Sequence, residues 1–311
     1  MIWRRVLAAA MLAASAGALL PQETVFRVDV RLVRLLTTVK NDSGQLVGNL
    51  QQGDFQVFDN GVRQDLAVFE HHTEQPLSIA LMIDTSASTG IDLRYETESV
   101  NRFLRALFRE GNPQDAVKLY SFNYDTTSLS SGFTRRVEVL EHALKGLKCE
   151  GGTSLYDALW FAARSLDDRE GRHVVVVVTD GGDTTSSRNF HQALEAAQMA
   201  DAVIYPVLVV PITNDPGRNT GGEHALTTLA KGTGGRVFEP TLGEALDQAF
   251  ADLLRELRAQ YLLGYYPKGV PPSKDRFHRL EVKLRRPDLR VLARSGYYGE
   301  AERATGWKLA R

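Results

Sequence analysis

The segment 77–88, with the sequence LSIALMIDTSAS, limits what this chain can fold into more than any other. It starts as a run of apolar and small residues, which is typical of a strand buried on both faces of a parallel sheet. The run ends at Asp84, and hydroxyl residues follow at Ser86 and Ser88. The pattern predicts a carboxylate and two hydroxyl groups just past the carboxyl end of a buried strand, the edge at which open α/β sheets bind ligands.

Helices and strands alternate in the sequence pattern after this segment. Strands are predicted at residues 116–122, 173–179, 202–210 and 235–238, and helices at residues 91–109, 137–147, 155–166, 190–200, 223–231 and 242–260. The alternation predicts an α/β fold with a doubly wound, mostly parallel, Rossmann-like sheet that has helices on both faces.

The two flanks of this region have β character. Strands are predicted at residues 24–40, 55–58 and 62–69 on one side, and at 261–266, 277–284 and 291–298 on the other. They cannot easily join the parallel sheet, because no crossover helices separate them. We expect them to pair in one small β-sandwich-like unit. The predicted boundaries are 1–20 for a signal peptide, 21–76 for an N-terminal β-unit, 77–260 for the α/β domain and 261–311 for the C-terminal strands.

The N-terminal residues have the layout of a secretory signal peptide. Arg4 and Arg5 precede the apolar run 6–20, and small residues around Ala16 suit cleavage. The run is short for a membrane span, so we expect cleavage and export to the periplasm or beyond, with an uncleaved anchor as the alternative. The formal net charge of -1 gives no electrostatic basis for binding nucleic acid or an anionic membrane.

Two more loops can bring oxygen atoms to the same sheet edge. Thr153 lies in EGGTSLY, just before a predicted helix, and Asp180 directly follows a predicted strand. Asp84, Ser86, Ser88, Thr153 and Asp180 then form a predicted cluster of five oxygen ligands. Oxygen donors with few carboxylates suit Mg²⁺, and Mn²⁺ or Ca²⁺ are the alternatives. Two acids and three neutral hydroxyls leave the metal free to take a Glu or Asp carboxylate from a partner.

Each loop taken alone has a simpler interpretation. The residues after Asp84 could cap the next helix, Thr153 could be a helix N-cap, and Asp180 could begin a turn. All three loops in this order, each at the matching end of its element, favour a metal site. Residues 183–185 are expected to cap the helix that follows them, with a place beside the metal ligands as the alternative.

The pattern Asp-x-Ser-x-Ser, together with Thr153 and Asp180, resembles the metal-ion-dependent adhesion site (MIDAS) of von Willebrand factor type A (VWFA) domains. Thr85 and Ala87 replace the glycines usual in the first loop. The flanks GDFQVFDNGVRQDLAVF, YLLGYYP and VLARSGYY are similar to the VWFA-related acidobacterial family. The resemblance implies a secreted or periplasmic, non-enzymatic binding or adhesion module that captures a protein ligand through a divalent metal.

The sequence is compatible with one other class of function and argues against a third. A structural or assembly subunit of an envelope complex would use the metal only to join the loops, or would leave the site empty. A hydrolase could use Ser86 as nucleophile with Asp180, but it lacks a base, because His173 lies at the amino end of its predicted strand. No nucleophile elbow, P-loop or dinucleotide-binding motif is present, so we expect no enzymatic activity.

Overall fold

The computed structural model describes residues 32–71, 75–90, 92–209, 220–271, 273 and 275–299. The predicted signal peptide and the first part of the predicted strand 24–40 lie outside these residues. From Leu32 onward the chain groups into one compact unit.

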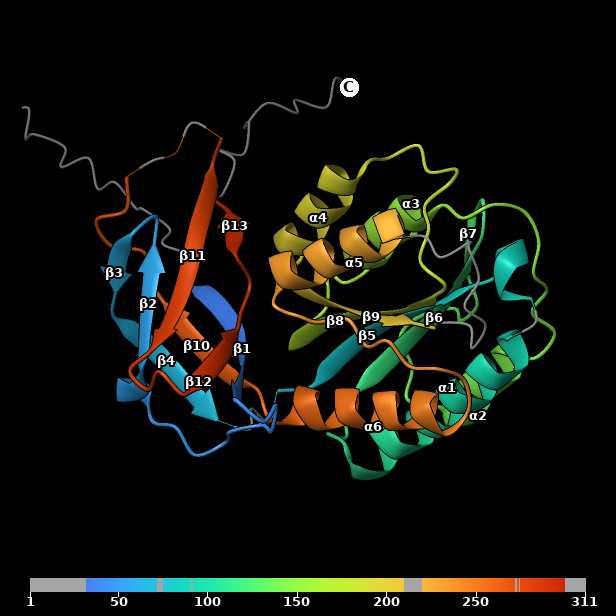
Figure 1. The fold of residues 1–311 in the computed structure, drawn as a ribbon, viewed down its shortest axis with the longest axis horizontal. Coiled ribbons are helices and arrows are strands. Elements are labelled where there is room, and N and C mark those ends of the chain that lie inside the picture. Colours follow the sequence, from blue (N-terminus) through green and yellow to red (C-terminus); the bar gives the residue numbers. More distant parts are fainter. Residues whose placement is uncertain are drawn as a thin grey trace, which may run out of the picture. The chain divides into compact units, whose positions relative to one another are not determined.

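A five-stranded sheet forms the centre of the α/β domain, in the order β7-β6-β5-β8-β9 (Figure 1). The strands are β5 (Leu77–Asp84), β6 (Ala116–Phe122), β7 (Thr126–Ser128), β8 (Arg172–Thr179) and β9 (Ala202–Leu208). β6, β5, β8 and β9 pair in parallel, and β7 is antiparallel to β6. The chain winds from β5 to β6 in one direction and from β8 to β9 in the other. The direction therefore reverses between β5 and β8, which confirms the predicted doubly wound sheet.

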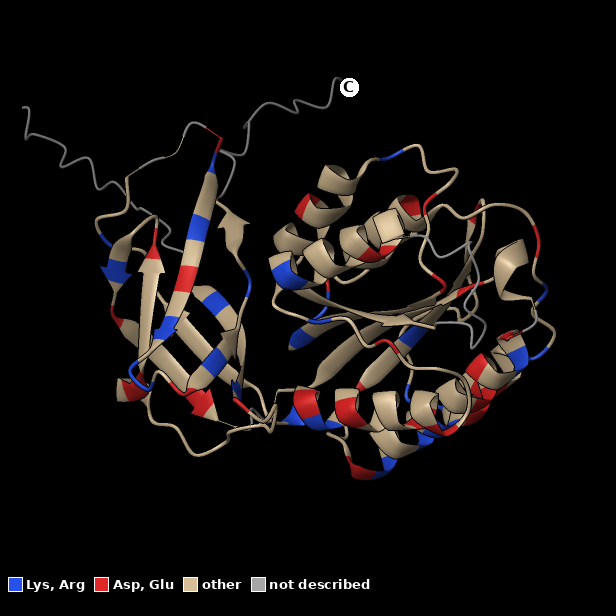
Figure 2. Ribbon diagram, viewed as in Figure 1, with Lys and Arg blue, Asp and Glu red and all other residues tan. Residues whose placement is uncertain are grey.

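Helices cover both faces of this sheet (Figure 1). One group is α1 (Leu93–Glu110), α2 (Val137–Ala143) and α6 (Glu244–Arg258), and the other is α3 (Leu155–Arg164), α4 (Phe190–Met199) and α5 (Thr220–Thr233). Alternate residues of β5 serve the two faces: Ile79 and Leu81 belong to the core under the first group, and Ala80 and Met82 to the core under the second. Figure 2 shows Lys, Arg, Asp and Glu residues along α1 and α6; of these, Glu96 and Glu256 are buried.

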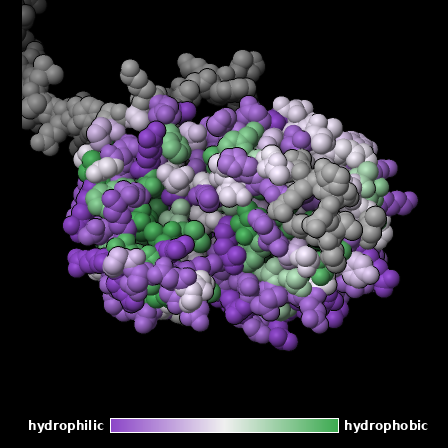
Figure 3. Space-filling model, in the orientation of Figure 1, coloured by the Kyte–Doolittle hydropathy of each residue, from purple (hydrophilic) through white to green (hydrophobic). Residues whose placement is uncertain are grey.

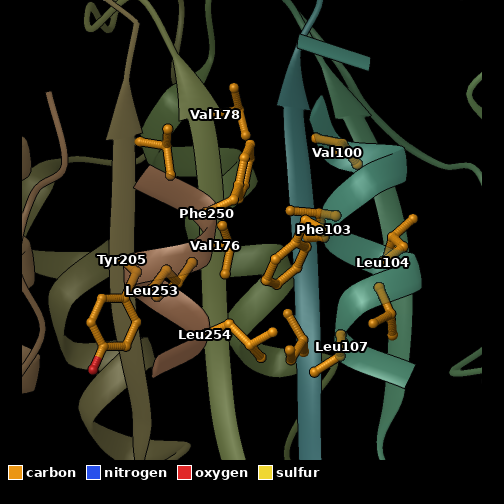
Figure 4. Packing of buried hydrophobic residues seen from close by; sticks show 14 of the residues in the cluster. Val100, Phe103, Leu104, Leu107, Val176, Val178, Tyr205, Phe250, Leu253 and Leu254 are labelled. Carbon is orange, nitrogen blue, oxygen red and sulfur yellow. The ribbon is translucent and has the colours of Figure 1, made fainter. Parts of the chain in front are cut away.

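The core under α1 follows from the spacing of its apolar residues. Val100, Phe103, Leu104 and Leu107 recur at helical intervals and are buried. In Figure 4 the Phe103 side chain points from α1 toward α6 and β8, and the rings of Phe103 and Phe250 have centroids 5.1 Å apart.

The flanking strands form two four-stranded antiparallel sheets. The first, in the order β12-β1-β10-β4, contains β1 (Val33–Asn41), β4 (Leu66–His71), β10 (Tyr261–Tyr265) and β12 (Leu289–Leu292). The second, in the order β13-β11-β2-β3, contains β2 (Phe55–Asp59), β3 (Val62–Gln64), β11 (Phe277–Leu284) and β13 (Gly296–Tyr298). Each sheet combines strands from both flanks, and one apolar cluster includes residues of both sheets. The predicted β-sandwich-like unit is therefore confirmed.

Several predicted elements differ in detail from the structure. The predicted strand 62–69 divides into β3 and β4, because β3 pairs with β2 while β4 pairs with β10 in the other sheet. The predicted strand 291–298 is interrupted for the same reason, since β12 pairs with β1 and β13 with β11. Residues 235–238 contribute a single bridge, between Phe238 and Val207. β7 was not predicted, because three polar residues carry no periodic signal.

A buried carboxylate of the α/β domain forms an ion pair with a strand of the β-sandwich. Glu256 of α6 is buried, and its Oε2 lies 2.7 Å from Lys40 Nζ of β1 and 2.7 Å from Arg236 Nε. A buried charge is tolerated when it is paired in this way.

A second buried carboxylate joins the two sheets of the sandwich. Asp59 of β2 accepts hydrogen bonds from the hydroxyls of Tyr265 at 2.8 Å and Tyr297 at 2.9 Å, and lies 2.9 Å from His278 Nδ1. These four side chains come from β2, β10, β11 and β13.

The surface in Figure 3 is mostly hydrophilic, with apolar groups between the polar ones. Among the described residues, the exposed large apolar side chains lie far apart in the sequence: Tyr95, Tyr124, Phe161, Met199 and Tyr266. Of the helices in the described residues, none combines the length and the apolar content that crossing a bilayer requires.

Replacing Phe103 by Ala should lower the free energy of unfolding by about 3–5 kcal/mol, because it removes a buried ring and leaves a cavity against Phe250. Urea denaturation followed by circular dichroism measures the loss. Phe161→Ala is the control, because Phe161 is 44% exposed. Equal losses in the two variants would contradict the assignment of Phe103 to the core.

Candidate metal site

Asp84 is the last residue of β5 and is fully buried. One carboxylate oxygen, Oδ1, accepts a hydrogen bond from the backbone N–H of Ser86 at 2.8 Å. The other, Oδ2, accepts a hydrogen bond from the hydroxyl of Thr179, the last residue of β8, at 2.6 Å. The two bonds fix the orientation of this carboxylate at the point where the winding direction of the sheet reverses.

The two serines of the first loop lie next to each other. Ser86 Oγ and Ser88 Oγ are 3.1 Å apart. The loop is held by a 3₁₀ turn (Ala87–Thr89), in which the Thr89 hydroxyl lies within hydrogen-bond distance of the carbonyl oxygens of Asp84 and Ser86. Two neighbouring ligands of an octahedral Mg²⁺, each about 2.1 Å from the ion, lie about 3 Å apart. The spacing of the two hydroxyls therefore fits such an ion.

The second loop is hydrogen-bonded directly to the first. The N–H of Ala87 donates to the carbonyl of Gly151 at 3.1 Å, and the N–H of Glu150 donates to the carbonyl of Thr85 at 2.9 Å. Gly151 has a φ of 73°, and a Cβ at this position would lie 2.4 Å from Cδ1 of Tyr124. The left-handed backbone at this position favours glycine, whose missing Cβ leaves room for the Tyr124 ring.

The third loop is hydrogen-bonded to the second. The hydroxyl of Thr184 accepts from the N–H of Thr153 at 2.8 Å, and the N–H groups of Thr184 and Thr185 donate to the Thr153 carbonyl. Thr153 is buried between these contacts. Asp180 enters this loop directly after Thr179, so the Asp84–Thr179 bond holds it near the first loop.

Residues 183–185 were expected to cap the helix that follows them, but they do not. Asp183 Oδ1 accepts from the backbone N–H of Tyr156, in the first turn of α3, at 3.2 Å. The N-cap of α4 is Asn189, which accepts from the N–H of Gln192. The expectation was wrong because proximity in the sequence did not reveal that α3 begins beside this loop.

Two of the five predicted ligands have uncommitted side chains. Neither the Thr153 hydroxyl nor the Asp180 carboxylate makes a hydrogen bond to any other residue that the structure describes. The structure thus brings Asp84, Ser86 and Ser88 into one hydrogen-bonded loop, with Thr153 and Asp180 on the two adjoining loops. That these five residues bind a metal stays a prediction. Among the described residues, no three His, Cys, Asp or Glu side chains are grouped to hold an ion. The predicted site has only two carboxylates, and its other three donors are hydroxyl groups.

Negative charge accumulates at this edge of the sheet. Burial raises the pKa of Asp84 to about 6, against the lowering effect of its hydrogen bonds from Thr179 and Ser86, and the charge of Asp180 raises it further. Burial raises the pKa of Asp92 as well, again with a contribution from Asp180. Burial and then the charges of Asp84, Asp92 and Asp180 raise the pKa of Glu96 to about 8. A bound cation would offset this repulsion.

The sequence reasoning missed two residues beside the site. Thr179 orients Asp84. The sequence feature that could have revealed it is a hydroxyl residue at the end of the β-branched run of β8. Glu96 lies on the buried stripe of α1, four residues before Val100, and its Oε2 has no hydrogen-bond partner among the residues that the structure describes. An acid at an apolar position of an amphipathic helix was the signal there.

Residues 79–182, roughly a third of the chain, match the family model of the von Willebrand factor type A domain. This segment of the chain is therefore a VWFA domain. A search of curated proteins gave no match.

The chain is also similar to several solved structures. It has 13% identity to the PilB minor pilin from Streptococcus sanguinis, with a TM-score of 0.48 over 60% of this chain and 62% of the pilin. It has 14% identity to the vWF domain of the pilus tip protein Mfa5 from Porphyromonas gingivalis, with a TM-score of 0.47 over 60% of this chain and 96% of that domain. For the pilus adhesin SpaC from Lactobacillus rhamnosus GG, the identity is 11% and the TM-score 0.49, over 80% and 48% of the two chains. The chain thus spans less than two thirds of the length of the pilin.

Glu96→Gln should stabilise the metal-free protein at pH 8 by on the order of 4 kcal/mol, and by little at pH 4.5. The folded-state pKa of Glu96 lies above its ordinary value. The folded wild type therefore holds this proton more tightly than the unfolded chain, and loses stability as the pH rises from about 4.5 to 8. Denaturation in chelator at the two pH values measures the difference. Glu98→Gln, on the exposed side of α1, is the control, and equal behaviour of the two variants would contradict the assignment.

Proposed function

We propose that this protein is an exported, non-enzymatic binding module that captures a protein ligand through a divalent cation, Mg²⁺ in the first instance. Asp84, Ser86, Ser88 and Thr153 would hold the ion directly or through water, and Asp180 mainly through water. The observation that carries the proposal is the Ser86–Ser88 hydroxyl pair beside the fixed carboxylate of Asp84. Mn²⁺ and Ca²⁺ are the alternative ions.

The charges favour an acidic group on the ligand. A cation with hydroxyl ligands keeps much of its charge, so it attracts a Glu or Asp side chain. Without the cation, Asp84, Asp92 and Asp180 would repel that side chain, since each of these carboxylates raises the pKa of Glu96. Capture of the ligand should therefore depend strictly on the metal.

The hydrogen bonds between the loops argue against a purely structural metal. The first loop is joined to the second by two backbone hydrogen bonds, and the second is joined to the third through Thr153 and Thr184. These contacts hold the loops together without an ion. The second candidate is an envelope-complex subunit whose metal is structural or whose site is empty. A structural metal is distinguished from ligand capture by whether removal of the metal unfolds the domain.

Export rests on the sequence of residues 1–20, and membership in the VWFA-related acidobacterial family rests on the flanking segments. Both are part of the proposal. Cleavage of the N-terminal segment is expected, and the N-terminal residue of the secreted protein would establish it.

Isothermal titration of Mg²⁺ and Mn²⁺ into the chelator-treated protein should show one saturable site that is lost in Asp84→Ala and Thr153→Ala. The reason is that each variant removes a donor whose position the loops fix. Asp168→Ala, an exposed acid beyond α3, is the control and should bind as the wild type does. Circular dichroism of the variants should show an intact fold. Unfolding of Asp84→Ala on its own would favour the structural metal.

The same samples test capture of an acidic ligand. An array of peptides with a central Glu or Asp, beside matched peptides with Gln or Asn, is probed in Mg²⁺ and in chelator. Binding is expected for the acidic peptides in Mg²⁺ alone, and not with Asp84→Ala. Metal binding without any preference for acidic peptides would sink the capture proposal while leaving the metal site in place.

Thr179→Val should weaken metal binding by about 10- to 100-fold without unfolding the domain, because it removes the hydroxyl that orients Asp84 while keeping the side-chain shape. The titration above measures the change. Thr127→Val on the exposed face of β7 is the control. An unchanged affinity in Thr179→Val would show that the orientation of Asp84 is set by Ser86 alone.

A further inference from the structure

A cavity lies between the sandwich strands and the amino ends of β8 and β9, at the edge of the sheet opposite the candidate metal site. Its lining includes Arg34 of β1, Arg172 at the start of β8 and Arg294 after β12. The volume open to the centre of a water molecule is about 30 Å³. A single water needs about 10–15 Å³ by this measure, so there is room for a small polyatomic ion.

The charges around this cavity do not balance. Three guanidinium groups line it, and Asp201 is the one carboxylate among the lining residues. Asp201 pairs closely with Arg294, and its Oδ2 is 3.7 Å from Arg34. No carboxylate contacts Arg172 in the described part of the chain; it donates instead to the carbonyl oxygens of Gln75 and Leu257. The lining therefore has a net excess of two positive charges.

Two of the three arginines are too deeply buried for water to offset that excess. Arg172 is 6% exposed and Arg294 is 8% exposed. The Nε–H of Arg294 has no hydrogen-bond partner in the described residues. Burial lowers the pKa of Arg172 to about 10, and the charge of Asp115, which is not in contact with it, only partly opposes this shift. Buried charges of this kind cost stability unless an opposite charge meets them.

Guanidinium groups recognise oxyanions in a specific way. Their planar fork matches two oxygen atoms of a phosphate or carboxylate, and such charge-assisted bonds are stronger than neutral ones. Gln198 and Thr233 also line the cavity, but their side chains already have partners. Gln198 donates to the carbonyl of Gly232, and the Thr233 hydroxyl accepts from the N–H of Ile204 and donates to the carbonyl of Leu229. The free donor capacity therefore belongs to the arginines.

We propose that this cavity binds one small oxyanion, such as phosphate or a carboxylate, through Arg34, Arg172 and Arg294. The anion contacts β1 and the segment after β12 on the sandwich side, and β8 on the side of the α/β domain. It therefore stabilises the junction between them. This site is independent of the proposed metal site, which lies at the other edge of the sheet.

The test measures the melting temperature and the heat of binding of the full mature chain in chelator, with phosphate, acetate or chloride at matched ionic strength. A saturable rise in melting temperature is expected with phosphate or acetate, because a ligand that binds only the folded state stabilises it. Arg294→Gln and Arg34→Gln should raise the dissociation constant at least tenfold. Arg34 is partly exposed, so its variant keeps the test usable if Arg294→Gln does not fold.

The controls separate site binding from general salt effects. Arg290→Gln, on β12 with a largely exposed side chain, should bind as the wild type does. Asp84→Ala should also bind the anion normally, which separates this site from the proposed metal site. The proposal is overturned if the three salts give the same non-saturating shift, which is the general effect of excluded ions. It is equally overturned if chloride alone saturates, or if Arg34→Gln and Arg294→Gln both bind as tightly as the wild type.

Discussion

The parallel pairing of β5 with β8 is the constraint on which the rest of this structure depends. The register sets Ile83 beside Val178, so the next residues along, Asp84 and Thr179, meet at the carboxyl ends of the two strands. The chain winds away from this pair in opposite directions, which leaves the two strand ends uncovered by a crossover. A one-residue slip would exchange the residues facing the two helical layers, and both apolar cores oppose it. The packing of helices against the two faces of the sheet therefore determines where the loops at its edge lie.

The carboxylates at this edge reduce the stability that the cores provide. Asp84 and Glu96 are buried, and both would hold a proton more readily than in water. A chain selected for stability alone would place apolar or amide groups there. The loops keep their shape because backbone hydrogen bonds join them, so the repulsion acts on the ionisation of the acids and not on the course of the chain.

The sequence predicted the architecture well because the strongest signals are periodic. The apolar run before Asp84 and the β-branched run before Asp180 are unmistakable strands, and the stripe on α1 is a clear amphipathic helix. The weaker points were local. The divided strands at 62–69 and 291–298 read as continuous, since which sheet a strand joins depends on partners far away in the sequence. Thr179 and Glu96 were missed because each acts through a neighbour that only the folded chain brings close.

The pairing of β4 with β10 has a consequence for how the chain folds. His71 and Tyr261 lie opposite each other in this pair, and their rings stack with centroids 4.8 Å apart. The whole α/β domain lies between these two residues in the sequence. β10 lies between β1 and β4 in the first sheet of the sandwich. This sheet therefore cannot be completed until the intervening domain has been synthesised. Contacts so distant in sequence form slowly. The topology therefore limits the order of synthesis: every strand of the α/β domain is complete in the chain before β10 begins, so its sheet can form before the first sheet of the sandwich is complete.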